Sequence, residues 1–110
     1  MSEIVRYRGD TWPIRMTILQ DDVPMNIAGC DFVLTVDSKK TPPDDTTNLF
    51  QLIGTIEGDP ADGNVVFEPS ELDVDRVGKF FYDLQVTDTS LKKRTIAKDR
   101  FTLMQDITKV

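Results

Sequence analysis

The chain has 110 residues, a formal net charge of −6, a single cysteine and no histidine. This length suits one domain with one core, and the acidic balance argues against nonspecific nucleic-acid binding and against attachment to anionic membranes. The absence of histidine removes the commonest general base and metal ligand, and the lone Cys30 excludes an intrachain disulfide.

Export and membrane insertion are also disfavoured by the sequence. No apolar run approaches the roughly 20 residues that a membrane-spanning helix needs. The N-terminus lacks the apolar segment of a signal peptide. We therefore expect a single domain over residues 1–110 that is made in the cytoplasm, with no membrane or nucleic-acid partner.

The first part of the chain predicts three strands. A short strand over 4–7 ends at Arg8-Gly9-Asp10, where the glycine permits a kink. Alternating apolar residues over 12–18 predict a second strand, and a turn follows at 21–24. A third alternation over 30–36 predicts a third strand, in which Cys30 occupies the place of a small core residue rather than of a reactive thiol.

The middle of the chain predicts loops and shorter strands. Residues 37–48 are polar and loop-like, whereas 49–56 resume an extended apolar pattern. Turn chemistry over 58–64 indicates a hairpin connection to a short strand at 65–67. Residues 69–72 predict one helical turn, with a serine as its cap.

Residues 78–88 predict the longest strand, because apolar side chains recur at every second position. The last strand follows over 95–104. The pattern of about seven short strands is typical of an all-β antiparallel sandwich, and no stretch has the period of a crossover helix. The expected core comprises Trp12, Ile14, Met16, Ile18, Cys30, Phe32, Leu34, Val36, Val65, Phe67, Phe80, Tyr82, Leu84, Val86, Ala97, Phe101 and Leu103.

The outer face of the last two strands is the candidate contact site. The inward-facing residues of strands 78–88 and 95–104 are expected to share one face of the sheet. Odd-numbered residues of one strand then lie opposite even-numbered residues of the other, and Asp83 lies opposite Lys98 or Arg100. Apolar side chains then occupy a face that should be polar. The predicted partner contacts are Val33, Phe81, Ile96, Lys98 and Arg100. The alternative is that these apolar residues are scattered singly, or that the 37–48 loop folds over them.

Other candidate sites are weaker. Arg8-Gly9-Asp10 spells an adhesion tripeptide, but a kink explains it more simply. Glu57–Asn64 clusters oxygen ligands that could hold calcium, although the spacing fits no EF-hand loop. The acidic pairs at 21–22 and 44–45 form no catalytic dyad, because adjacent side chains of an extended chain point apart. Lys92-Lys93-Arg94 is expected at a solvated hairpin tip. We expect no cofactor, no metal and no enzymatic activity.

The ordered set of segments resembles the N-terminal immunoglobulin-like domain of phage baseplate upper proteins. The matching segments are 8–11, 25–30, 63–67, 78–88, 101–103 and 106–108. The resemblance implies an immunoglobulin-like β-sandwich. Asp99 departs from the glycine common at that position, which suggests altered pairing. The chain ends just after the domain, so a receptor-binding role is not carried over with the resemblance.

The resemblance also implies a function. It points to a non-enzymatic structural protein of a bacteriophage virion, in the tail, baseplate or neck, that assembles in the host cytoplasm with other virion proteins in a ring or multimer. The alternative is a module that binds a host-surface glycan or receptor. Such a module should expose clustered aromatic side chains at one loop end, where this sequence has acids, prolines and glycines.

Overall fold

The computed structural model describes residues 3–42 and 46–105. Over these residues the chain is all-β, with ten strands, one 3-10 helix and no α-helix. The elements are β1 (Ile4–Tyr7), β2 (Ile14–Thr17), β3 (Leu19–Gln20), β4 (Val23–Pro24), β5 (Asp31–Asp37), β6 (Asn48–Ile53), β7 (Thr55–Ile56), η1 (Pro60–Asp62), β8 (Asn64–Phe67), β9 (Gly78–Thr87) and β10 (Lys93–Met104). The expectation of strands without crossover helices is confirmed for the described part of the chain.

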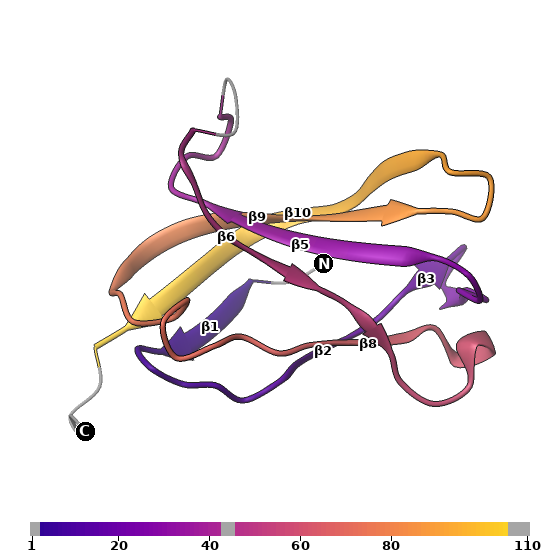
Figure 1. Cartoon of the computed structure of the whole chain (residues 1–110), viewed down its shortest axis with the longest axis horizontal. Helices are drawn as coiled ribbons and strands as arrows, with labels where there is room; N and C mark the ends of the chain where they lie inside the picture. Colours follow the sequence, from indigo (N-terminus) through magenta and orange to yellow (C-terminus); the bar gives the residue numbers. More distant parts are fainter. Residues whose placement is uncertain (1–2, 43–45, 106–110) are drawn as a thin grey trace.

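Two sheets pack face to face in a sandwich-like arrangement (Figure 1). The larger has the order β1-β10-β9-β5-β6, and the smaller has the order β2-β8-β7. Strands β3 and β4 form a separate two-stranded sheet. The prediction that all pairing is antiparallel needs one correction, because β1 runs parallel to β10. After β1 the chain crosses to β2 in the opposite sheet, so β1 joins β10 without a hairpin between them.

The predicted extended stretch over 49–56 is divided between the two sheets at Gly54. Strand β6 pairs with β5, whereas β7 pairs with β8. The Gly54 N–H donates to the Phe32 carbonyl at 2.8 Å. A Cβ atom at this glycine would meet Val65 at 2.6 Å and Phe67 at 2.8 Å, so a larger residue would force these side chains to shift where the chain crosses the core.

Most of the predicted core is confirmed. Met16, Cys30 and Phe80 are only partly buried but pack against the core. Trp12 is the clear error, with 73% of its surface exposed. Its backbone N–H donates to the Asp10 carboxylate at 3.0 Å, so Trp12 lies in the turn before β2 rather than on its inner face. The residues that join the core without having been predicted are Ile4, Ile27, Phe50, Leu52 and Val74.

A β-bulge in β10 changes the predicted faces of that strand. The register with β9 shifts between Thr95 and Ala97. Thr95 therefore lies opposite Gln85 and is exposed. From Ala97 onward odd residues oppose even ones, as predicted. The irregularity expected at Asp99 is absent, because this residue pairs with Tyr82 within the continuous ladder.

Candidate functional site

The candidate site lies on the outer face of the five-stranded sheet, where β9 is flanked by β10 and β5. Arg100 lies opposite Phe81, and Lys98 lies opposite Asp83. On the other side of β9, Thr35 also lies opposite Asp83. The predicted cross-strand pairing of Asp83 with a cation of β10 is therefore confirmed, and the Phe32 strand pairs alongside β9 as expected.

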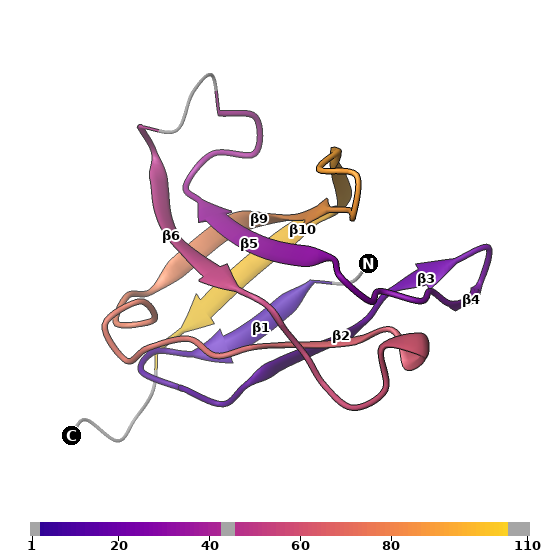
Figure 2. The ribbon, with the colours of Figure 1, turned by 45° about the vertical axis from the view of Figure 1, so that its right-hand side comes forward.

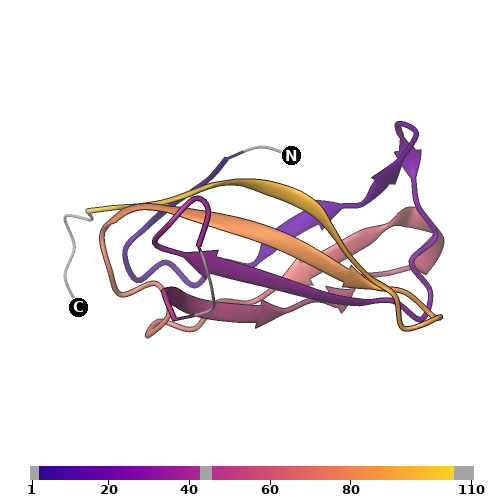
Figure 3. The ribbon, with the colours of Figure 1, turned by 90° about the horizontal axis from the view of Figure 1, so that it is seen from above.

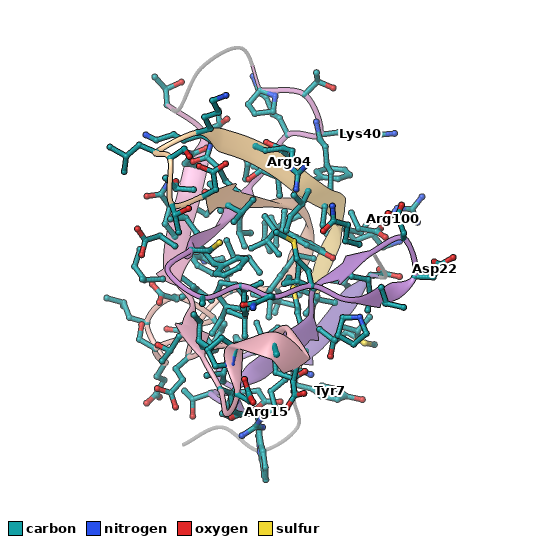
Figure 4. All side chains as sticks on the ribbon, turned by 90° about the vertical axis from the view of Figure 1, so that its right-hand side faces the viewer. Tyr7, Arg15, Asp22, Lys40, Arg94 and Arg100 are labelled. Carbon is teal, nitrogen blue, oxygen red and sulfur yellow. The ribbon has the colours of Figure 1, made fainter. Side chains whose placement is uncertain are left out.

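An open cleft of about 660 Å³ lies at this position, lined by Lys40, Lys79, Phe80, Phe81, Lys98, Asp99 and Arg100. Three of the five predicted contact residues line it, namely Phe81, Lys98 and Arg100. In Figure 4 the Lys40 and Arg100 side chains point to the same side of the ribbon. Pairing between β9 and β10 fixes the spacing of most of these side chains, so the cleft is built on rigid elements.

The charge of the cleft is opposite to that of the chain. Its lining contains four cationic side chains and one carboxylate, that of Asp99. The chain as a whole has a net charge of −6. A concentration of cations beside aromatic rings suits an anionic partner that also has apolar groups to bury.

The loop that follows β5 places Lys40 at the rim of the cleft. Asp37 is the buried charged residue at the base of this loop, with 5% of its surface exposed. Its carboxylate accepts hydrogen bonds from the Lys39 N–H at 2.7 Å and from the Thr47 hydroxyl at 2.8 Å. These contacts hold both ends of the loop together. The acidic pair at 44–45 lies outside the described residues.

The same loop partly shields Phe81. A small pocket of about 50 Å³ is lined by Lys40 and Pro42 of the loop, together with Phe81 and Asp83. Phe81 is accordingly half-buried rather than fully exposed. The expectation that the loop folds over this face is therefore met at Lys40 and Pro42, and the partner contact at Phe81 stays a prediction.

Burial raises the pKa of the Asp83 carboxyl above its ordinary value, the neighbouring Lys98 ammonium lowers it, and the nearby Asp37 carboxylate raises it. The net shift is upward. Burial and the repulsion from Asp37 therefore outweigh the attraction of Lys98, and the charged form of Asp83 is disfavoured in the folded protein.

The remaining two predicted contact residues lie away from the cleft. Val33 sits on β5 opposite Gln85 and Ile53, and is half-buried. Ile96 was expected on the outer face, but it lies at the bulge and packs against the core. Its placement is therefore corrected, because the extra residue of the bulge turns it inward.

Sequence reasoning missed Lys40 and Lys79. The sequence could have identified Lys79, because it alternates at period two with Phe81 and Asp83 along β9 and so shares their outer face. No sequence pattern identifies Lys40, because its position depends on the hydrogen bonds that Asp37 makes across the loop.

The other candidate positions have structural roles. Cys30 packs against the core, and burial, together with Asp88 and Asp31, raises the pKa of its thiol. Gly9 adopts a left-handed φ of 78° in the kink after β1. The Asp59 carboxylate caps η1 by accepting from the Ala61 N–H at 2.9 Å.

The basic run 92–94 is exposed beside the turn after β9. Within residues 3–42 and 46–105, no group of three or more His, Cys, Asp or Glu side chains is arranged to hold a metal ion. The same residues include no helix long and apolar enough to cross a membrane.

Neither a protein-family model nor a curated protein sequence matches the chain.

Proposed function

We propose that this chain is a non-enzymatic structural protein of a bacteriophage virion, a tail, baseplate or neck component that acts by protein–protein assembly. The observation that carries the proposal is the cationic, aromatic-lined cleft on an exposed sheet face of an acidic protein. Complementary charge speeds encounter with a partner and excludes wrong partners, while a half-buried ring supplies apolar area to the contact.

The proposed fold within the all-β class is immunoglobulin-like. Under this hypothesis the neighbouring strands β5, β9 and β10 correspond to strands C, F and G of an immunoglobulin domain. In the smaller sheet, β2, β8 and β7 correspond to strands B, E and D. This strand order supports the hypothesis. The resemblance of segments such as 78–88 to the immunoglobulin-like domain of phage baseplate upper proteins supports the virion assignment.

The proposal is tested on virus particles. Particles are purified from a culture that carries the coding gene, and their proteins are identified by mass spectrometry. We expect peptides of this chain at a fixed copy number, as for a component of a ring or multimer. Particles that are complete and infectious without the chain would contradict the proposal.

A second candidate function is capture of an anionic glycan on a host surface. The specific observation in its favour is that Phe80 and Phe81 share the cleft with four cationic side chains. Titration calorimetry with sulfated oligosaccharides separates the two functions. Binding that is lost in both Phe81→Ser and Arg100→Gln would favour the glycan. We expect no such binding if the cleft serves assembly.

A further inference from the structure

The hairpin of β3 and β4 projects from the sandwich (Figures 2 and 3). Among the residues that the structure describes, its two strands pair only with each other, and all four of their residues are exposed. Leu19 and Val23 leave 56% and 60% of their surfaces in water. A two-stranded hairpin alone is marginally stable at best, so an arm that exposes apolar side chains in this way gains from a covering partner.

The tip of the hairpin is acidic and adopts an unusual backbone conformation. Asp21 and Asp22 have φ values of 53° and 65°. Positive φ at both central residues defines the tight hairpin turn that favours Asn-Gly or Asp-Gly. Glycine at the second position would relieve the backbone, yet a second carboxylate is present there. Aspartate tolerates this conformation as a single residue, so the turn forms with two carboxylates side by side at its tip.

The base of the hairpin is fixed to the sandwich. The Ile18 N–H donates to the Gly63 carbonyl at 2.7 Å, and the Met25 N–H donates to the Ile18 carbonyl at 2.9 Å. A Cβ atom at Gly63 would approach the Ile18 carbonyl oxygen at 2.7 Å, so the close approach requires glycine. An arm held in a fixed direction loses little conformational entropy when it docks.

The cleft described above complements this arm. Its four cationic side chains match the two carboxylates of the tip, and its rings match the flanking Leu19 and Val23. The acidic tip and the cationic cleft lie on the same side of the molecule, as Asp22, Lys40 and Arg100 show in Figure 4.

Arm and cleft of one molecule lie too far apart to meet. The hairpin leaves the sandwich at the end of β9 that carries Thr87, which is paired with Asp31 at the start of β5. Lys79 of the cleft lies at the opposite end of this strand, about 26 Å away at the rise of an extended chain. A partner for either surface would therefore come from another molecule.

We infer that the β3–β4 hairpin of one copy docks into the cationic cleft of the next copy. The inference rests on the proposed assembly function and deepens it, because it names the contact surface and the partner. Each copy presents one arm and one cleft, so the contact is heterologous. Such contacts repeat head to tail and give a ring if the rotation between copies closes, or an open filament if it does not.

Sedimentation velocity on the purified chain, over a concentration series at low and high salt, tests the inference. The arm variant is Asp21→Asn/Asp22→Asn, since asparagine tolerates the left-handed conformation and keeps the turn. The cleft variant is Lys79→Gln/Arg100→Gln. The control, Glu68→Gln/Glu71→Gln, removes two exposed acids outside the hairpin. Circular dichroism confirms that each variant is folded.

We expect the wild type and the control to associate at low salt and to dissociate at high salt. Each of the other variants should associate about two- to thirty-fold more weakly, the range for two exposed charge pairs. An equimolar mixture of arm and cleft variants should recover the wild-type affinity for one contact and favour the dimer over longer assemblies, because each mixed pair has one intact arm facing one intact cleft.

Three results would overturn the inference. The first is a wild type that stays monomeric up to millimolar concentration. This result overturns the inference whether or not the monomer binds a heparin-derived oligosaccharide in the cleft. The second is an arm variant that associates as the wild type does. The third is an associating wild type whose two variants, when mixed, form no dimer. Virus particles that lack the chain would refute the virion proposal alone, because the self-association is measured on the purified protein.

Discussion

Substitution of Gly54 by alanine tests the crossing of the chain between the two sheets. The added Cβ would lie 2.6 Å from Val65 Cγ1, 2.8 Å from Phe67 Cε1 and 2.9 Å from Phe32 Cβ. Carbon atoms in a packed core lie about 3.5–4.0 Å apart, so three neighbours must move by roughly 1 Å. All three are buried side chains with 0–1% of their surfaces exposed.

The magnitude follows from two opposing effects. Overpacking a core costs about 1–3 kcal/mol, and contacts on three sides favour the upper part of that range. Alanine lowers the conformational entropy of the unfolded chain relative to glycine, and this effect stabilises the folded state by about 0.4–1 kcal/mol. We therefore expect a net loss of about 1–2 kcal/mol in the free energy of unfolding, or at least about 4 °C in Tm for a domain of this size.

Urea denaturation followed by intrinsic fluorescence measures this loss. Val65→Ala provides the background control, because it removes the nearest obstructing atom and should reduce the cost of Gly54→Ala, so that the two changes are not additive. A free energy of unfolding for Gly54→Ala within about 0.5 kcal/mol of the wild type would refute the account of the crossing.

Three further predictions concern the core and the site. Leu84, which has no exposed surface, should cost about 2–5 kcal/mol when truncated to alanine, and an unchanged Tm for Leu84→Ala would refute its central placement. The raised pKa of Asp83 means that the folded state binds its proton more tightly than the unfolded state, so this group opposes stability as pH rises from the ordinary carboxyl pKa through the raised one. Asp83→Asn should therefore gain in Tm relative to the wild type at neutral pH and lose that gain in acid, and a gain that is absent at neutral pH would contradict the shift. Phe81→Ser should remain folded, because Phe81 is only half-buried, but should enter particles less well; unfolding, or incorporation equal to the parent, would show that it is not a contact residue.

Alternation of apolar residues was sufficient to predict the long strands. β5 and β9 appear within a residue or two of the predicted bounds, and the inward residues Phe32, Leu34 and Leu84 are buried. The pairing register from Ala97 onward also followed, because both inward sets must face the same core. Period-two patterning carries this information directly, since it specifies a face for each residue.

Features that depart from the period-two alternation of the strands were not predictable. Trp12 continues the alternation of β2, but the Asp10 carboxylate turns the chain before the strand begins. Nothing in the pattern of β10 marks the bulge beside Ile96. Ile27 and Val74 belong to loops, where no periodicity identifies a buried residue. The bulge, Ile27 and Val74 are fixed by tertiary packing rather than by local preference.

The candidate site was predictable in its strand residues only. Phe81, Lys98 and Arg100 follow from the β9–β10 register, and they line one cleft. Lys40 comes from a loop whose position depends on Asp37. The complementary hairpin was recognised as a turn, but its projection from the sandwich depends on the contacts of Gly63 with Ile18 and Met25.

Assembly through the cationic cleft is tested most directly by the copy number of a charge-reversed chain in virus particles. Lys79→Glu/Arg100→Glu reverses two cations of the cleft, and Lys92→Glu/Lys93→Glu makes the same change at the exposed turn after β9. Each variant is supplied to particles whose own copy of the gene is deleted, and its abundance is measured by quantitative mass spectrometry. We expect near loss of the cleft variant and wild-type abundance of the turn variant. Equal incorporation of the cleft variant and the wild type would contradict the account.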